Sequence, residues 1–435
     1  MLEPWITPSL FYRFLNKTHS QGVGMDSYGL CEALGPVEGN RVMRSHWDAW
    51  VTEDHVRGLA ERQVEVVRLP IGDWTLKPYG PYIGCMDGAA EKIDWFMDMC
   101  QKYGIKVLLD IHAMKGSQNG FDNSGQSLGL EWTDENNFVH WPIESANWMG
   151  DYDLPNNEYK NIYFEQDRGV NWALDVVKGL MERYGRHPAL YAFEPLNEPW
   201  WNSDYAVLKG YYRAARNIIR SINPDVIFTF HDGFMYDADM WNDLFEDNDL
   251  HNVVMDTHFY QAWWGKGALP DYCWGYYNLW NTAHALKYPV WVGEWSLATD
   301  VCALWLGGFN DANTAAVFPC SYVECPKPYM PAETAVDVDR TKDINGPFGT
   351  ALGDGFDHAF IKNGMCATDS TYFSDADVAM LGGCALRAFD DIGITGQFLW
   401  TFRNELEDKW SYTNAFDKGW LNTANPVPQG QPLQQ

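Results

Sequence analysis

Apolar residues recur along the chain in seven short runs, and each run is followed by a segment of different periodicity. The runs are rich in Val, Ile, Leu and Phe over most of their length, which is typical of parallel strands buried on both faces. We predict strands in these runs, at 64–72, 106–112, 190–198, 226–232, 253–260, 290–295 and 396–402.

The segments between the runs carry apolar residues at helical spacing, most clearly at 52–63, 89–104, 170–185, 208–222 and 374–393. Repeated alternation of strand and helix predicts a doubly wound sheet or a (β/α)8 barrel. Polar residues at the carboxyl ends of strands from all round the set favour the barrel, because those ends converge on one mouth. A Rossmann sheet would need a glycine-rich turn after its first strand, and the sequence has none. We therefore predict an α/β fold, a (β/α)8 TIM barrel with long loops at its C-terminal face.

The predicted strands are one short of eight. Only three residues precede Pro4, too few for a strand, so we interpret the first strand as truncated. We predict one catalytic domain over residues 1–422 and a flexible C-terminal tail over 423–435.

The net charge of the chain limits the kinds of molecule that it can bind. With 59 acidic and 31 basic residues the formal net charge is −28, which repels nucleic acid and anionic membranes. No apolar run is long enough to span a membrane. The chain has 22 Trp, whose flat faces stack on sugar rings. A Trp-rich core is the alternative interpretation, and for the loop clusters at 200–201 and 263–264 we weigh the two equally.

Nine cysteines without a CxxC pair do not form a zinc or redox motif. Cys100 and Cys384 fall in helical segments, where we predict buried thiols. We predict a secreted or cell-surface protein; no signal peptide is present, and we interpret the start as trimmed. This compartment favours disulfides in one loop-rich region, among Cys302, Cys320, Cys325 and Cys366.

Two glutamates lie four residues apart in the third run, "LYAFEPLNE". Alternation along a strand predicts Glu194 and Glu198 on one face and Asn197 on the other. At about 3.3 Å per residue, Glu194 lies roughly 13 Å below Glu198, so only Glu198 reaches the mouth. We predict that Glu194 pairs with a polar group deeper in the barrel.

A second carboxylate, Glu294, stands at the matching height in "VWVGEW". Two carboxylates at one barrel mouth are typical of glycoside hydrolysis, in which one donates a proton and the other attacks the anomeric carbon. We expect the charge of Glu294 to raise the proton affinity of Glu198. A purely structural role for each glutamate is the alternative, which this pairing makes the minority interpretation.

Other polar and aromatic groups end neighbouring strands and can frame the two glutamates. Arg68 can hold a carboxylate ionised, and Trp400 can form the floor of a sugar site. No ligand spacing predicts a metal, no GxSxG elbow predicts a nucleophilic serine, and we predict no cofactor. The remaining framing residues are His112, His258 and Tyr260.

Eight motifs, in this order, resemble glycoside hydrolase family 5, and within it the fungal-type exo-β-1,3-glucanases. The most specific is a strand-ending His followed by "GSQNGFDNSG". The resemblance covers residues 3 to about 420, in which 128–166 and 326–372 look longer than the fungal pattern. The motifs are "EPWITPSLF", "HWDAWVTEDH", "VVRLPIGDW", "DIHAMKGSQNGFDNSG", "EPLNEPW", "THFYQAW", "GEWSLATDVCALWLGG" and "FLWTFRNE".

The resemblance implies a role for each site residue. Glu198 would be the general acid/base and Glu294 the nucleophile. Asn197 would contact the 2-hydroxyl of the sugar, and Phe121 and Trp263 would clamp the next sugar. Terminal glucose would be bound near Glu3, Asp122 and Asn123, with Arg68, His112, His258, Tyr260 and Trp400 framing the site.

The resemblance implies a retaining enzyme that releases glucose from the non-reducing ends of β-1,3-glucan. Its partner would be the polysaccharide or oligosaccharide, and we expect a monomer. Endo action, β-1,6 or other β-glucan specificity and transglycosylation stay open, because loop shape decides them. A glucan-binding protein on an inactive barrel is the alternative outside the enzymes.

Overall fold

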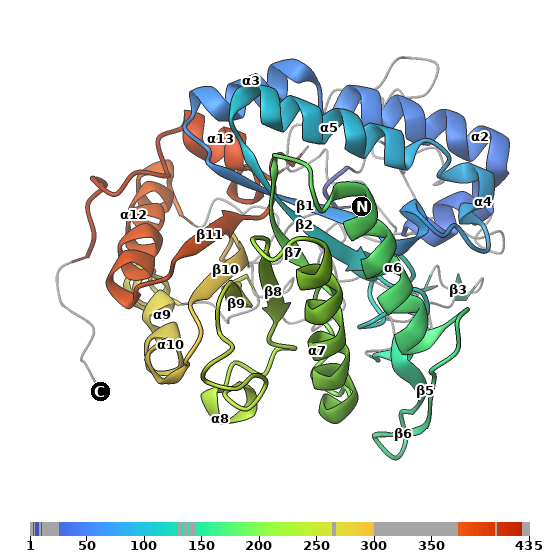
Figure 1. Ribbon diagram of the computed structural model, residues 1–435. Helices are drawn as coiled ribbons and strands as arrows, with labels where there is room; N and C mark the ends of the chain where they lie inside the picture. Colours follow the sequence, from blue (N-terminus) through green and yellow to red (C-terminus); the bar gives the residue numbers. More distant parts are fainter. Residues whose placement is uncertain are drawn as a thin grey trace.

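Seven parallel strands occupy the centre of the molecule, and the long helices lie outside them (Figure 1). The computed structural model describes residues 3, 5–7, 10, 26–128, 132–133, 138–139, 145–262, 267–299, 373–404 and 407–428. The strands are ordered β1-β2-β7-β8-β9-β10-β11, and each neighbouring pair is parallel. This order confirms the predicted α/β barrel, with the strand ends brought to one mouth.

Each strand of this sheet coincides with a predicted apolar run. Two strands end three or more residues earlier than predicted: β7 stops at Glu194 and β11 stops at Leu399. Glu198 therefore lies in the loop that follows β7. The bounds are β1 Val66–Gly72, β2 Lys106–Ala113, β7 Leu190–Glu194, β8 Ile227–His231, β9 Val253–Phe259, β10 Val290–Trp295 and β11 Gly396–Leu399.

The five predicted helices are present, and a further long helix, α2, was not predicted. Its backbone bends at Gly35, where φ is 70°, just before Pro36. Proline has no N–H for the helix ladder, which accounts for the break. The long helices are α2 Ser27–Trp50, α3 Glu53–Glu61, α5 Ala89–Tyr103, α6 Gly169–Tyr184, α7 Tyr205–Ile222 and α12 Asp375–Ile392.

Short elements decorate the barrel. A hairpin of β5 and β6, within the segment that looked long in the sequence, projects from the lower right of Figure 1. The other long segment, 326–372, lies outside the described residues. The short elements are α4 Tyr82–Cys85, α8 Ala238–Trp241, α9 Leu269–Gly275, α10 Trp280–Ala285, α13 Tyr412–Asp417, η2 Asp73–Thr75, η3 Asp122–Ser124, η4 Asn147–Met149, η5 Tyr276–Leu279, η8 Asp408–Trp410, β3 Trp132–Thr133, β4 Phe138–Val139, β5 Gly150–Asp153 and β6 Glu158–Ile162.

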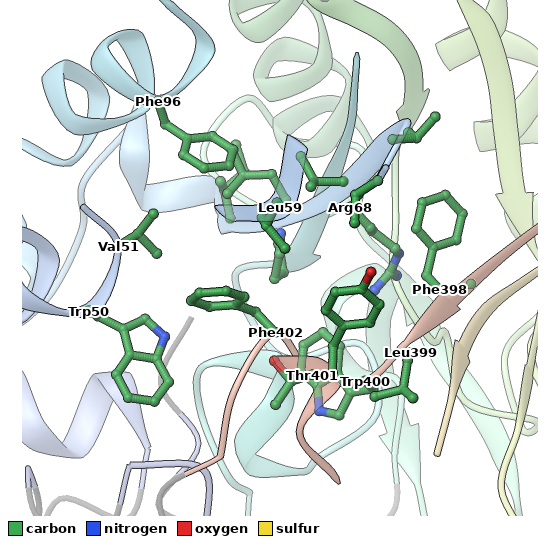
Figure 2. Close-up of a pocket in the computed structure, with 18 of the residues that line it drawn as sticks. Trp50, Val51, Leu59, Arg68, Phe96, Phe398, Leu399, Trp400, Thr401 and Phe402 are labelled. Carbon is green, nitrogen blue, oxygen red and sulfur yellow. The ribbon is translucent and has the colours of Figure 1, made fainter. Parts of the chain in front are cut away.

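The edge strands β1 and β11 both line one cavity of about 890 Å³. Apolar side chains from both edges and from neighbouring helices surround it, including Trp50, Leu59, Phe96, Phe398 and Phe402 (Figure 2). In the described part of the chain, the central sheet thus has seven of the eight strands of a closed barrel, as predicted.

Two layers of side chains follow each other along the barrel axis, an apolar layer and then a layer of carboxyl groups. Inside the barrel, Leu108, Val254 and Trp291 cluster with Ala192. Each of these residues precedes a carboxylate by two or three positions on its own strand, so the cluster lies beneath a charged layer. The layer beneath these carboxylates is consequently apolar.

Residues 423 and 425 lie against α12. The guanidinium of Arg387 donates to the backbone oxygens of Thr423 and Asn425, and the Asn425 amide donates to the Ala379 oxygen. The division between domain and tail at residue 422 stays a prediction. Among the described helices, none combines the length and apolarity that a membrane crossing requires.

Two disulfides tie helices together in the described part of the chain. Cys31–Cys85 joins α2 to α4, and Cys273–Cys384 joins α9 to α12. The prediction of a free thiol at Cys384 is wrong, because the docking of α9 on α12 brings it to a cysteine 111 residues away in sequence. Cys100 is a buried free thiol, as predicted. The four cysteines predicted to pair, Cys302, Cys320, Cys325 and Cys366, lie outside the described residues.

Replacing Cys273 and Cys384 together by Ser is expected to lower the free energy of unfolding by about 2–5 kcal/mol, because the crosslink closes a long loop. Urea unfolding followed by tryptophan fluorescence measures this loss. Cys100→Ala, which removes a buried sulfur without removing a crosslink, is the matched control. A loss no larger than that of the control would contradict the prediction.

Candidate active site

Glu294 lies near the carboxyl end of β10 and is held on both oxygens. Arg68 Nη1 lies 2.7 Å from Oε1, and the Tyr260 hydroxyl donates to Oε2 at 2.7 Å. The residue is 5% exposed. A guanidinium and a hydroxyl donor thus fix the two oxygens of this carboxyl group in position.

Glu198 follows β7 in a loop whose backbone enters the left-handed region, with φ at 41°. Its Oε1 lies 2.6 Å from His258 Nδ1, and its Oε2 accepts a bond from Asn123 Nδ2 at 2.6 Å. The Asn119 amide donates to the Glu198 backbone oxygen at 3.3 Å. These contacts hold a rarely populated backbone conformation that aims the carboxylate at His258.

The strand alternation predicted for Glu194, Asn197 and Glu198 is wrong for Asn197. Because β7 ends at Glu194, the three residues do not share one strand. Arg68 donates to Glu194 Oε2 at 3.1 Å and to Asn197 Oδ1 at 2.7 Å, so both side chains face the same guanidinium. Asn197 belongs to the site, as the resemblance implied.

His258 brings the two candidate carboxylates together. Its Nδ1 lies 2.6 Å from Glu198 Oε1 and 3.4 Å from Glu294 Oε2. The two oxygens are therefore at most 6.0 Å apart, the sum of these distances. Burial lowers the pKa of His258, but the charges of Glu294 and Glu198 and the contact with Asp256 raise it well above its ordinary value.

Glu198 differs from the prediction in its proton affinity. Burial raises its pKa, but the hydrogen bond and positive charge of His258, with the charge of Arg68, outweigh burial and leave the pKa below its usual value. The expectation that Glu294 makes Glu198 hold its proton is therefore wrong for the free protein. The lowered pKa of Glu198 and the raised pKa of His258 both favour the proton on His258 in their 2.6 Å contact.

Arg68 faces a second layer of carboxylates below the mouth. Its Nη2 lies 3.1 Å from Asp110 and 3.1 Å from Glu194, both fully buried. Burial raises the pKa of Asp110 to about 7 and that of Glu194 well above its usual range, although the Arg68 charge opposes both shifts. The raised pKa of Glu194 favours its protonated form, which leaves more of the Arg68 charge to Glu294. The prediction that Glu194 pairs deeper in the barrel is confirmed.

His112 orients Asn197 from the side. Its Nδ1 donates to Asp110 Oδ2 at 2.6 Å, and its Nε2 lies 3.5 Å from the Asn197 amide nitrogen. Burial lowers the pKa of His112 to about 3, so the ring is neutral and Nε2 accepts. Trp400 stacks on this ring with centroids 5.3 Å apart. Asn197 is thus held through both ends of its amide.

Glu3 and Asp122 form an acidic pair beside the mouth. Trp5 Nε1 donates to Glu3 Oε2 at 2.7 Å. Burial, then the charges of Asp122 and Glu294, raise the pKa of Glu3 well above its usual range, and burial raises that of Asp122 to about 7. Glu3 is therefore near enough to Asp122, Glu294 and Glu198 for their charges to act on it.

Aromatic side chains extend the site from Phe121. Its ring lies 5.1 Å from Trp200, which lies 4.8 Å from Phe234. Phe234 and Trp201 are 40% and 45% exposed, so this surface can stack a ligand. Trp263, predicted to face Phe121, lies outside the described residues.

Sequence reasoning missed the buried acids that support the two histidines. Asp110 and Asp256 each precede a histidine by two positions on a strand, in Asp110-Ile111-His112 and Asp256-Thr257-His258. Residues at i and i+2 share a face, so a repeated D-x-H pattern was the available signal. Asn119 and its contact with Glu198 had no comparable signal.

One set of described residues, Glu198, His231 and His258, brings possible metal-ligand atoms within 4.8 Å of one another. The Gly233 N–H donates to His231 Nδ1 at 2.9 Å, which leaves the ring proton on Nε2. A metal would have to displace that proton and the one His258 shares with Glu198. The chemistry of this set therefore favours protons over a metal ion.

The chain is similar to known glycosidases. The family model described as Cellulase (glycosyl hydrolase family 5) matches residues 33–309. Glucan 1,3-beta-glucosidase of Blumeria graminis is 28% identical, over 99% of this chain and 84% of the relative. Probable glucan 1,3-beta-glucosidase A of Aspergillus niger is 31% identical, over 71% of this chain and 66% of the relative. Glucan 1,3-beta-glucosidase of Yarrowia lipolytica is 30% identical, over 74% and 71%.

A solved structure shares the fold. The rutinosidase from Aspergillus niger superposes with a TM-score of 0.61 at 17% identity, over 97% of this chain and 94% of that chain. At 17% identity this similarity shows a shared fold and nothing more.

Replacing Arg68 by Met is expected to cost about 3–5 kcal/mol of unfolding free energy, because it leaves buried carboxylates without their cation. Glu194→Gln is the matched control: it mimics the protonated acid, so we expect a loss below about 1 kcal/mol. Urea unfolding at pH 7 measures both. An equal loss in the two variants would mean that Glu194 is ionised, contrary to this account.

Proposed function

The chain belongs to glycosyl hydrolase family 5 and is a glycosidase, and we propose that it hydrolyses β-1,3-glucan with retained configuration, releasing glucose from non-reducing ends. Its three relatives named above carry glucan 1,3-beta-glucosidase in their names. These names support β-glucan as the substrate class, and the geometry of the site supports the proposed course of the reaction.

The observation that carries the proposal is the meeting of Glu198 and Glu294 at His258. Their oxygens are at most 6.0 Å apart, the sum of the 2.6 and 3.4 Å contacts to His258 Nδ1. Retaining glycosidases hold their carboxyl groups about 5–5.5 Å apart, whereas inverting enzymes need about 6.5–9.5 Å to fit a water. The separation supports retention.

In the first step, the ionised Glu294 attacks the anomeric carbon while the bond to the departing sugar oxygen breaks. Arg68 and Tyr260 aim the attacking carboxylate. The proton shared by His258 and Glu198 passes through Glu198 to the departing oxygen, so no free alkoxide forms. The product of this step is a glycosyl ester of Glu294.

In the second step, water enters where the departing sugar was. Glu198, now in its base form, takes a proton from the water as its oxygen bonds to the anomeric carbon. Glu294 leaves as a carboxylate, again stabilised by Arg68 and Tyr260. Two displacements on one carbon return the original configuration. The Asn197 amide, fixed between Arg68 and His112, is placed to bond the 2-hydroxyl.

Glu3 and Asp122 support action on chain ends. Their raised pKa values let one of the pair act as a donor and the other as an acceptor near neutral pH, which suits sugar hydroxyls. An acidic wall of this kind, beside the catalytic pair, would bind a terminal glucose. Phe121 and Trp200 would stack the following sugar.

An extracellular location agrees with the disulfides Cys31–Cys85 and Cys273–Cys384, since such bonds persist in oxidising compartments. We infer that the protein is secreted or held at the cell surface and acts as a monomer on glucan, over a catalytic domain of residues 1–422.

Product analysis on a linear β-1,3-gluco-oligosaccharide tests the proposal. We expect glucose alone from the first time point, and a loss of at least about 10³-fold in kcat for Glu294→Gln, which removes the attacking carboxylate. Glu194→Gln, the same change at the neighbouring buried glutamate, is the matched control and should retain most activity. Larger fragments appearing first would favour endo action, and equal losses in both variants would contradict the assignment of Glu294.

Retention has its own test. Proton NMR of the first product should show the β-anomer of glucose ahead of mutarotation, because the glycosyl ester is displaced from the face that the departing sugar occupied. The α-anomer appearing first would overturn the two-step course, whatever the substrate.

A further inference from the structure

Asp256 lies beneath both catalytic carboxylates and is fully buried on β9. Its Oδ1 accepts a bond from the Gly293 N–H at 2.6 Å, next to Glu294. Its Oδ2 lies 3.5 Å from His258 Nε2, on the ring whose other nitrogen contacts Glu198. This single side chain therefore contacts the supports of both catalytic groups.

The residue before Glu294 is a glycine for a steric reason. A Cβ on Gly293 would lie 2.0 Å from Asp256 Oδ2 and 2.3 Å from Oδ1. Only the absence of a side chain allows the carboxylate to reach the backbone of β10. The close approach indicates that Asp256 occupies a built position rather than filling space.

His258 is surrounded by groups that decide whether it is charged. Glu198, Glu294 and Asp256 lie within 3.5 Å of its ring nitrogens. The His231 ring, 4.4 Å away, is neutral because burial lowers its pKa. Other ionisable groups that interact with His258 from the packed strands are Asp110, Glu194 and Asp232.

We propose that Asp256 is a positioning residue of the reaction: it holds a proton on His258 beside Glu198 and fixes the backbone that carries Glu294. The proposal rests on the glycosidase function above. Asp256 acts indirectly, through His258 on Glu198 and through the Gly293 backbone on Glu294. The pKa of His258, raised in part by Asp256, agrees with this role.

The contact between His258 and Glu198 accounts for the proton in both steps of the reaction. In the first step the proton leaves His258 Nδ1, crosses the 2.6 Å bond to Glu198 Oε1 and ends on the departing sugar oxygen. In the second step a proton of water returns by the same route to His258. Asp256 Oδ2, 3.5 Å from His258 Nε2, takes no part in the transfer itself.

Asp256→Asn separates the two parts of the role. Asparagine keeps an oxygen for the Gly293 N–H and removes the charge that faces His258. On a β-1,3-gluco-oligosaccharide, whose leaving group needs a proton, we expect kcat/KM at pH 7 to fall by at least about tenfold. The alkaline limb of the pH profile should move to lower pH, since a less basic His258 loses its proton earlier.

A second substrate distinguishes positioning from mere structural support. On 2,4-dinitrophenyl β-glucoside, whose leaving group departs without a proton, Asp256→Asn should stay within about threefold of the unmutated protein. Asp73→Asn, at a buried carboxylate bonded to Trp172 and the Lys115 N–H, is the control and should leave the pH profile unchanged. An equal loss on both substrates, or an unmoved alkaline limb, would overturn the proposal.

An NMR titration of ¹³C-labelled histidine tests the same charge without any substrate. His258, assigned with a His258→Gln sample, should be protonated at pH 7 in the unmutated protein and less so in Asp256→Asn. A neutral His258 in the unmutated protein would overturn the inference. Failure of the unmutated protein to cleave either glucoside would instead overturn the proposed function, because the titration needs no activity.

Discussion

The site depends on one buried cation. Arg68 lies on the edge strand β1, and its guanidinium contacts Glu294, Glu194, Asp110 and Asn197 at 2.7–3.1 Å. Five donors in a rigid fork can meet several acceptors at once, which an ammonium group cannot do with comparable geometry. Without this cation the lower carboxyl groups would lose their buried positive partner, and Glu294 would lose the contact that positions it.

The protonation of Glu194 and Asp110 affects how much of the Arg68 charge acts on Glu294. Three acids around one arginine would share its charge and weaken its hold on Glu294. Burial raises the pKa of Glu194 well above its usual range and that of Asp110 to about 7, so protons neutralise part of the layer. The apolar cluster around Trp291 beneath them maintains this burial. Packing at the bottom of the barrel thereby sets the charge at its mouth.

The sequence predicts the strands and the two candidate catalytic glutamates because both follow from local pattern. Apolar runs mark buried strands, and strand-end polar residues mark the mouth. What local pattern cannot give is a contact made by tertiary docking. Glu198 lies in the loop after β7 with φ at 41°, and Asn119 and Asn123 from the loop after β2 hold it there. Asn197 consequently faces Arg68, on the same side as Glu194, contrary to the prediction. The Cys273–Cys384 bond likewise depends on how α9 meets α12.

The two D-x-H pairs show how one motif takes two charge states. Both histidines are buried and both are supported by an aspartate, yet the pKa of His112 falls to about 3 while that of His258 rises. The difference lies at the other edge of each ring. His112 meets the neutral amide of Asn197 and lies near Arg68, whereas His258 meets Glu198 and Glu294. The same strand pattern therefore yields a histidine of lowered pKa that orients an amide on β2 and a histidine of raised pKa on β9, and the placement of Glu198 and Glu294 decides which is which.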